Sequence, residues 1–161
     1  MSSILKVDTI QNTAGAAPFV TSLGMKAQYF GVTLGDTTVS ASTTTKYNMS
    51  SLIGTGATLS NDLLTVTEAG DYLLQFFISC AYTSGSNSRY QENYLHVNAA
   101  KIIDSRDHVI NIDGNYEYYT CTGQRIYTLA ANDVLQVSGH GQGNYIVRSA
   151  YGSNFFGIKL S

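Results

Sequence analysis

The sequence predicts an all-β protein: a two-sheet jelly-roll sandwich of about ten strands, with a short N-terminal tether. Helical periodicity is nearly absent beyond the first two dozen residues. Strand-forming residues are abundant instead, including 12 tyrosines and 6 phenylalanines among 161 residues. Turn-forming residues interrupt the apolar runs about every ten residues, a spacing typical of sandwiches and barrels.

We expect one strand in each apolar or alternating run. In chain order these runs lie at 26–34, 44–49, 62–67, 71–82, 89–98, 100–104, 107–112, 116–129, 133–138, 144–149 and 154–160. The turns between them are rich in Gly, Asn, Asp and Ser, and they fall at 68–70, 84–88, 113–115, 131–132 and 139–143. The length fits one head domain, 26–161, preceded by a docking or tether segment, 1–25.

The run 71–82 is apolar on both faces. Alternate residues such as Tyr72 and Phe76 form one face, and Leu73 and Phe77 lie on the other. A strand with one wet face alternates cleanly between apolar and polar residues, and a two-sheet sandwich covers only one face of each sheet. The second face therefore needs a cover from another element or another subunit, and we favour a subunit.

Charge is scarce. Charged residues make up 12% of the chain, about half the usual share of roughly 25%. Surface covered by other subunits and a neutral Ser/Thr/Asn surface both explain this shortage.

The net charge of −2 gives no reason to expect nucleic acid or an anionic membrane as a partner. A secretory signal pattern and a run of 18 apolar residues are both absent, so we expect a cytosolic protein or one released without a signal, as by cell lysis.

Four segments carry a family resemblance. They are the strand–turn–strand LTVTEAGDYLLQF at 64–76, YLHVN at 94–98, IYTLAANDVLQV at 126–137 and the closing NFFGIKL at 154–160. In this order they resemble the trimeric jelly-roll heads of the complement q subcomponent and the tumour necrosis factor cytokines. The resemblance implies a homotrimer. A collagen-like Gly-X-Y stalk is missing, so the heads and the segment 1–25 would have to hold the trimer together.

The trimer implied by this resemblance needs an apolar interface. Tyrosine suits both subunit interfaces and sugar stacking, and we favour interface or core over ligand binding. The residues expected to be buried across the three-fold axis are Tyr72, Leu74, Phe76, Tyr94, Tyr116, Tyr118, Phe155 and Phe156.

The N-terminal peptide SILKVDTIQ at 3–11 is similar to the start of many virion proteins of marine phages and cyanophages, which are often fibre or appendage proteins. This resemblance implies docking on a particle. A short alternating segment can add as a strand to the edge of a particle protein. The expected docking anchors are Ile4, Leu5, Val7 and Ile10.

We therefore expect a phage virion structural protein, made in the host cytoplasm. It would be a homotrimeric surface knob, serving as capsid decoration or as a short fibre or appendage, that contacts other virion proteins through 1–25. The alternative is a receptor-binding tail fibre tip whose loops 83–88 and 139–143 touch host glycan or protein. A cellular trimeric ligand is a weaker third hypothesis.

Catalysis is not expected. His96, His108 and His140 stand without metal-ligand spacing, although a histidine near a three-fold axis is repeated and could bind a metal or anion, with His96 the best candidate. The run 139–143 is glycine-rich, but a strand rather than a helix follows it, so we expect a flexible hairpin turn and not a phosphate site. We expect no cofactor and no metal.

Two smaller groups have structural interpretations. Asp104, Asp107 and Asp113 lack the loop pattern of a calcium site, so we interpret them as surface residues in turns. Cys80 and Cys121 match no metal or redox spacing and lie in apolar runs. We expect them to be buried thiols, while a disulfide between them stays open.

Overall fold

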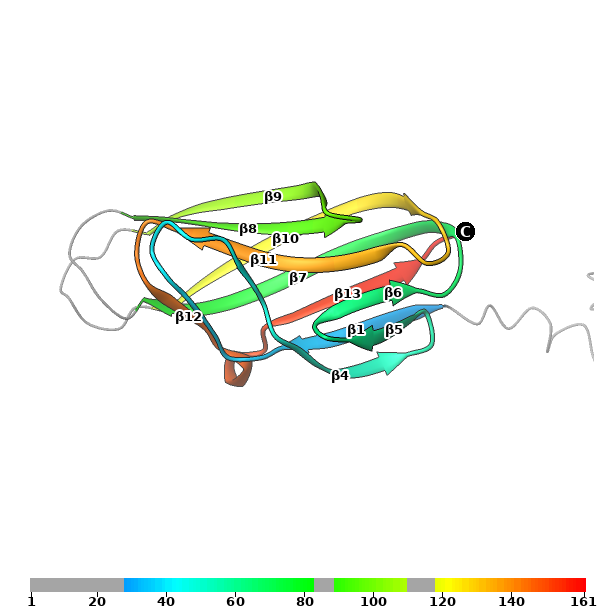
Figure 1. The fold of residues 1–161 in the computed structure, drawn as a ribbon, viewed down its shortest axis with the longest axis horizontal. Coiled ribbons are helices and arrows are strands. Elements are labelled where there is room, and N and C mark those ends of the chain that lie inside the picture. Colours follow the sequence, from blue (N-terminus) through cyan, green and yellow to red (C-terminus); the bar gives the residue numbers. More distant parts are fainter. Residues whose placement is uncertain (1–27, 83–88, 110–117) are drawn as a thin grey trace, which may run out of the picture.

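A computed structural model describes residues 28–82, 89–109 and 118–161. They form two antiparallel sheets packed face to face, with one 3-10 turn, η1 (Ser149–Tyr151) (Figure 1). The seven-stranded sheet A contains β1 (Tyr29–Leu34), β2 (Thr37–Val39), β4 (Met49–Gly54), β7 (Gly70–Tyr82), β10 (Tyr118–Leu129), β12 (Tyr145–Val147) and β13 (Asn154–Lys159). The six-stranded sheet B contains β3 (Thr45–Lys46), β5 (Ala57–Ser60), β6 (Leu63–Val66), β8 (Arg89–Val97), β9 (Ala100–Val109) and β11 (Val134–Gly141).

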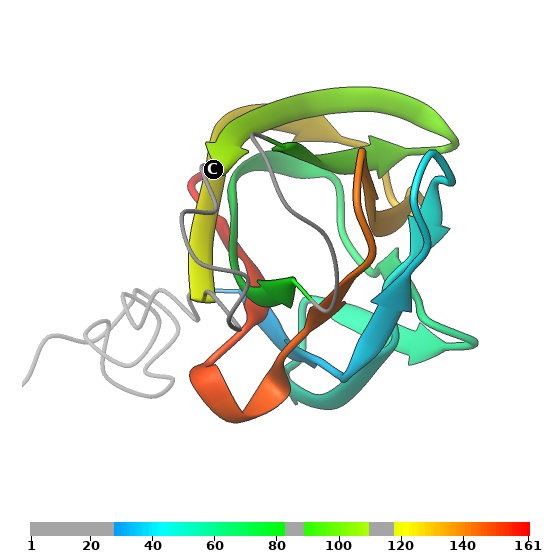
Figure 2. The ribbon, with the colours of Figure 1, turned by 90° about the vertical axis from the view of Figure 1, so that its left-hand side faces the viewer.

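Strand β7 is the centre of sheet A. It pairs with β10 on one side and with β13 and β12 on the other, and β1 and β4 continue the sheet beyond β13. In sheet B the order is β5-β6-β11-β8-β9, with β3 also paired to β11. Ser105 Oγ donates to the Thr122 carbonyl at 2.8 Å, and Arg125 Nη1 donates to the Ile102 carbonyl at 2.7 Å. These bonds join β9 to β10 and close one side of the sandwich, seen end-on in Figure 2.

The predicted all-β jelly roll is confirmed, with three local differences. The predicted strands 100–104 and 107–112 form one strand, β9, described as far as Val109. The polar residues between them do not interrupt it, because an edge strand tolerates polar side chains. The short strands β2 and β5 and most of β4 were not predicted, since the predicted strand 44–49 reaches only Met49, the first residue of β4. The predicted turn at 139–143 is also wrong in part, since β11 continues to Gly141 and pairs there with β8.

Position 139 of β11 is occupied by glycine because no side chain fits there. A Cβ there would lie 1.8 Å from Tyr47 Oη and 2.2 Å from Tyr145 Oη. Both tyrosines are fully buried, and their hydroxyls lie 3.0 Å apart. Tyr47 Oη also donates to Asn93 Oδ1 at 2.5 Å, so this buried polar group has partners inside the core. Burial raises the pKa of both tyrosines well above the usual range.

The core lies between the sheets and is built largely from β7 and its neighbours. Tyr72, Leu74, Phe76 and Phe155 are all fully buried in it, and the ring centroids of Phe155 and Phe30 lie 5.7 Å apart. Alternation along a strand places every second residue of β7 on this side. The remaining residues of β7 therefore point to the outer face of sheet A.

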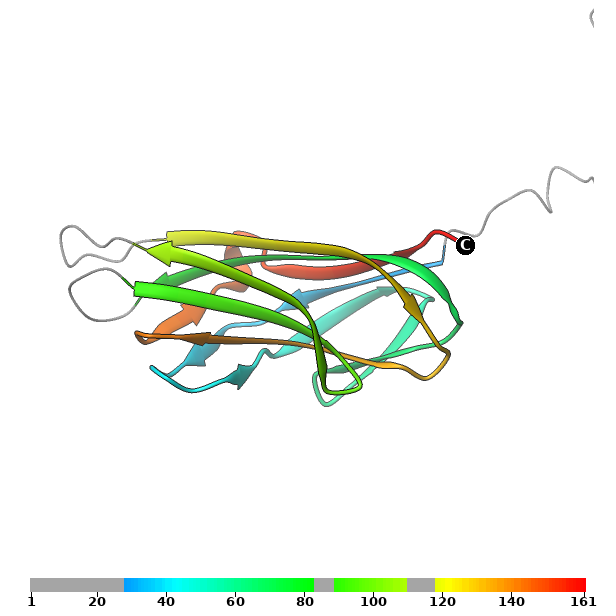
Figure 3. The ribbon, with the colours of Figure 1, turned by 90° about the horizontal axis from the view of Figure 1, so that it is seen from above.

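The head has two distinct ends. Gln28 and the C-terminal strand meet at one end, where the Lys159 amide donates to the Gln28 carbonyl at 2.7 Å. Two perpendicular views show that β7 ends and β8 begins at the opposite end of the sandwich (Figures 1 and 3). Strand β1 therefore begins at the end of the head that lies away from the end of β7.

Candidate interaction face

The outer face of sheet A carries an apolar surface that nothing in the described chain covers. Cross-strand pairs place side chains from neighbouring strands in rows across this face. One row contains Ile126, Leu73, Ile158 and Tyr29, and the next contains Gln124, Gln75, Phe156, Gly31 and Ile53. The exposed fractions are 62% for Ile126, 62% for Ile53, 45% for Tyr29 and 38% for Ile158. We call these two rows the apolar face.

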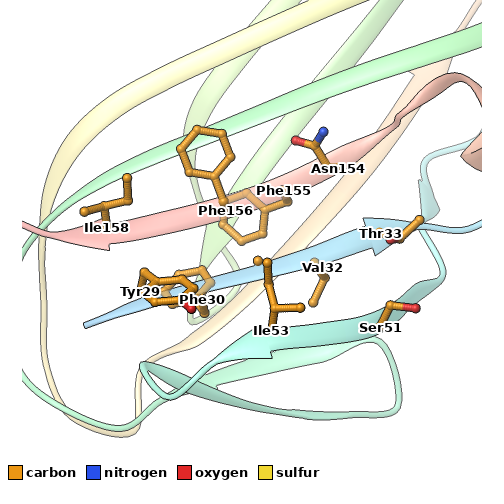
Figure 4. Close-up of a pocket in the computed structure, with 11 residues that line it drawn as sticks. Tyr29, Phe30, Val32, Thr33, Ser51, Ile53, Asn154, Phe155, Phe156 and Ile158 are labelled. Atoms are coloured by element: carbon orange, nitrogen blue, oxygen red, sulfur yellow. The ribbon is translucent and has the colours of Figure 1, made fainter. Parts of the chain in front are cut away.

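A groove of about 610 Å³ crosses the apolar face at β1. Gly31 forms its floor because it has no side chain, and Ile53 and Phe156 stand on either side (Figure 4). A Cβ on Gly31 would lie 3.2 Å from Ile53 Cγ1 and 3.7 Å from Phe156 Cβ. The groove is therefore an apolar trough that runs along β1, open to solvent in the single chain.

None of the residues in the two rows is charged. Depletion of charge combined with exposed apolar side chains is what distinguishes the centre of a protein interface from ordinary surface. An exposed apolar patch of this kind commonly marks an interaction site. The apolar face is therefore suited to covering by another apolar protein surface.

Sheet B has a different outer face, in which charged groups are paired within the chain. Glu92 is only 7% exposed and accepts hydrogen bonds from Tyr94 Oη and from the Arg106 guanidinium. His140 Nδ1 lies 3.6 Å from Glu92 Oε2, and the His140 ring stacks on Tyr90 with centroids 6.2 Å apart. Glu92 and Asp104 on this face thus have cationic partners within the chain, Arg106 and Lys101.

Four of the predicted interface residues lie elsewhere than expected. Tyr72, Leu74, Phe76 and Phe155 have no exposed surface in the single chain, because they fill the core between the sheets. A side chain without exposed surface has no area to bury against a second subunit, so these four are corrected to core residues. Burial also raises the pKa of Tyr72, and the nearby Glu68 carboxylate adds to the shift.

Tyr94 lies on sheet B, away from the apolar face, and its predicted interface role stays a prediction. It is 8% exposed, and Lys101 Nζ lies 3.9 Å above its ring. Burial raises the pKa of its hydroxyl, and the Asp104 carboxylate contributes to the rise. Phe156 alone among the predicted interface residues with described side chains lies on the apolar face, and it is half-buried.

Several predicted site residues cannot be placed. Ile4, Leu5, Val7, Ile10 and Tyr116 lie outside the described residues, as do the loop 83–88 and Asp113. Tyr118 begins β10, and only its backbone position is described. Their predicted roles in docking, interface and host contact stay predictions.

The sequence indicated that the run 71–82 has a second apolar face that needs a cover, but the interface residues predicted on this run were taken from the opposite face. The prediction that the run 71–82 needs a second cover rested on Leu73 and Phe77, and both are half-buried on the outer face. The more polar of the two faces, which also carries Gln75, is the one turned outward. Tyr29, Ile53, Ile126 and Ile158 were missed, since the alternation of a strand does not show which of its faces stays exposed.

The histidine and aspartate candidates do not form a site in the described part of the chain. His96 Nε2 lies 2.9 Å from Ser138 Oγ on sheet B, far in the fold from the apolar face, and Asp104 pairs with Lys101 at 3.1 Å. The described residues hold no group of three or more His, Cys, Asp or Glu side chains that could bind a metal ion. Cys80 and Cys121 are buried, as expected.

Within 28–82, 89–109 and 118–161, no helix has the length and apolar character needed to cross a membrane.

Known proteins match this chain in fold. No protein-family model matches the sequence, and no curated protein sequence matches it. The solved structure of the Eiger TNF of S. frugiperda is similar over 84% of this chain and 93% of its own, with a TM-score of 0.62 at 15% identity. The fold is a jelly roll of the tumour necrosis factor type.

Two structures of murine APRIL give the same result. One, at pH 8.5, matches 83% of this chain and 100% of its own, with a TM-score of 0.55 at 16% identity. The other, at pH 8.0, matches 82% and 98%, with a TM-score of 0.57 at 15% identity. At such low identity the likeness concerns the fold alone.

Proposed function

We propose that the chain is a non-enzymatic head that associates with copies of itself through the apolar face. The observation that carries this proposal is the pair of uncharged rows on the outer face of sheet A, with Ile53 and Ile126 both 62% exposed. Burying such surface stabilises an assembly by about 25 cal/mol per Å² of apolar area before the costs of association. Heads of the tumour necrosis factor type, which the chain resembles, are trimeric, and this supports a homotrimer.

The biological setting that we propose is a phage virion, in which the trimer serves as a surface knob. The similarity of the peptide 3–11 to the start of marine phage and cyanophage virion proteins supports this setting. The start of the described chain also supports it, because β1 begins at one end of the head and β7 ends at the opposite end. Three such segments on one trimer would bind a particle with the gain in avidity that multivalency provides.

Removal of residues 1–25 separates docking from assembly. We expect the shortened protein to form the same oligomer as the full chain, since the apolar face lies within the described head. We expect its loading onto particles to be lost. Light scattering measures the first result, and co-sedimentation with particles lacking the protein measures the second. A shortened protein that still loads would sink the docking proposal, and a full-length monomer would sink the proposed self-association.

A receptor-binding tip is the second candidate. It is favoured by the two-ended shape of the head, in which the ends of β7 and β9 lie opposite Gln28 and would point away from a docked particle. Purified oligomers are then expected to adsorb to host cells and to reduce infection by competition. Adsorption without competition would contradict this role, and so would the absence of both effects. Either result would leave the proposed structural role in place.

A further inference from the structure

Strand β1 is the first described strand of the head, and it is held on both of its sides. It forms five cross-strand pairs with β13 and four with β4. On the core side of the strand, Phe30 and Leu34 have no exposed surface, and Val32 is 3% exposed. Two backbone ladders and a row of buried side chains therefore fix β1 in the head.

The start of β1 is bound to three other parts of the head. The Gln28 carbonyl accepts a hydrogen bond from the Lys159 amide at 2.7 Å, and the Gln28 side-chain amide donates to Glu68 Oε1. The Tyr29 carbonyl accepts from the Gly56 amide at 3.0 Å. Lys159 Nζ lies 3.3 Å from Glu68 Oε2, so β13 and the turns that follow β4 and β6 meet here. We call Gln28, Glu68 and Lys159 the clasp.

The direction of a pull on β1 decides how these bonds break. Hydrogen bonds between antiparallel strands lie perpendicular to the strands, so a pull along the strand axis strains all of them at the same time. A pull across the strands opens a strand pair one residue at a time. Strand β1 begins at one end of the sandwich and β7 ends at the opposite end, which we call the distal end (Figures 1 and 3). A force between the two ends therefore acts along β1.

The geometry points to a mechanical anchor, in which β1 resists tension between a particle and the distal end of the head because this tension acts on β1 in shear. The inference rests on the proposed docking through the segment 1–25, which precedes β1 in the chain, so that a pull on a docked head enters at the start of β1. Sideways tension between β1 and β13 meets the clasp first and then one strand pair at a time. The head is thus strong along its strands and weak across them.

Optical tweezers that pull single full-length molecules in two directions test the anchor. One handle is always attached to the N-terminus. The second is attached through Gln142→Cys, an exposed position directly after β11 at the distal end, or through Leu160→Cys, directly after β13 and 52% exposed. Cys80 and Cys121 are buried, so they stay unlabelled. At equal force, the axial pull through Gln142→Cys is expected to unfold the head at least tenfold more slowly than the sideways pull through Leu160→Cys.

Removing the clasp separates the two directions further. Glu68→Ala deletes an exposed ion pair and a hydrogen bond that meet the sideways pull first, so sideways unfolding should become about threefold faster. Axial unfolding should keep its rate, because both ladders of β1 remain. Lys101→Ala is the matched control, since it deletes an exposed ion pair with Asp104 on sheet B, and it is expected to change neither rate.

The outcomes separate the anchor from the proposed function. Equal unfolding rates in the two directions, or faster axial unfolding, would overturn the anchor even in a protein that docks and associates as proposed. Acceleration of axial unfolding by Glu68→Ala to the same extent as sideways unfolding would also overturn it, because the clasp would then hold what the inference assigns to the ladders of β1. A shortened protein that still loads onto particles would remove the docking on which the anchor's role depends, while the difference between the two directions would remain.

Discussion

Replacing Phe155 by alanine is expected to lower the free energy of unfolding by about 3–5 kcal/mol, the usual cost of truncating a buried phenylalanine. Phe155 has no exposed surface, and it lies opposite Val32 and Phe76 on the core side of sheet A. Its ring also packs at 5.7 Å from that of Phe30. The cavity left by alanine would lie in the core between the two sheets, whose strands cannot collapse into it without breaking their register. Urea denaturation followed by far-UV circular dichroism measures the loss.

The same experiment distinguishes a core residue from an interface residue. The unfolding midpoint of an oligomer rises with chain concentration, because association stabilises the folded state. Phe155→Ala is expected to lower the midpoint at every concentration while keeping this dependence. If the variant instead kept its midpoint at high dilution and lost the concentration dependence, Phe155 would be an interface residue and its placement in the core would be wrong.

The fold could be predicted from the sequence because the strand pattern is strong where the strands are long. The run 71–82 was predicted within one residue of β7, and 116–129 and 154–160 matched β10 and β13 nearly as well. Strand β2 could not be predicted, since it has three residues and is held by pairing with β12, more than a hundred positions away in the sequence. A local sequence pattern carries no information about a pairing between strands so far apart in the chain.

The choice of face was the main error, and its cause is physical. A strand fixes the alternation of its side chains but not which side meets the second sheet. In β7 both faces are largely apolar, and only Asp71, Gln75 and Ser79 mark one of them as less so. The more apolar face packs in the chain's own core, where Tyr72 and Phe76 are fully buried. A surface that is exposed before assembly must also stay soluble, which accounts for the polar residues on the other side.

Glycines illustrate a second limit of sequence reasoning. The run 139–143 suggested a flexible turn, yet Gly139 lies in β11 because Tyr47 and Tyr145 fill the space of its side chain. Gly31 is likewise a strand residue, and its missing side chain creates the groove of the apolar face. In both cases the reason for glycine is a neighbour from another strand, which only the folded arrangement reveals.

Replacing Phe156 by glutamate is expected to convert the oligomer into folded monomers. Phe156 is half-buried on the apolar face, one residue along β13 from Phe155 and pointing to the opposite side. In the single chain a carboxylate at this position reaches water, so the fold is kept. In the assembly the same carboxylate would be buried without a partner, and breaking a buried contact in this way costs about 3–5 kcal/mol. Since about 1.4 kcal/mol is a factor of ten, the dissociation constant should rise by about a hundredfold or more.

Analytical ultracentrifugation over a range of chain concentrations measures this shift, and circular dichroism verifies that the monomer is folded. Thr58→Glu adds the same charge on sheet B and should leave the assembly unchanged, which separates a local effect from a change in net charge. The two phenylalanines should thus respond in opposite ways, Phe155 through folding and Phe156 through association. A Phe156→Glu protein that sediments like the wild type would show that the copies meet elsewhere than on the apolar face.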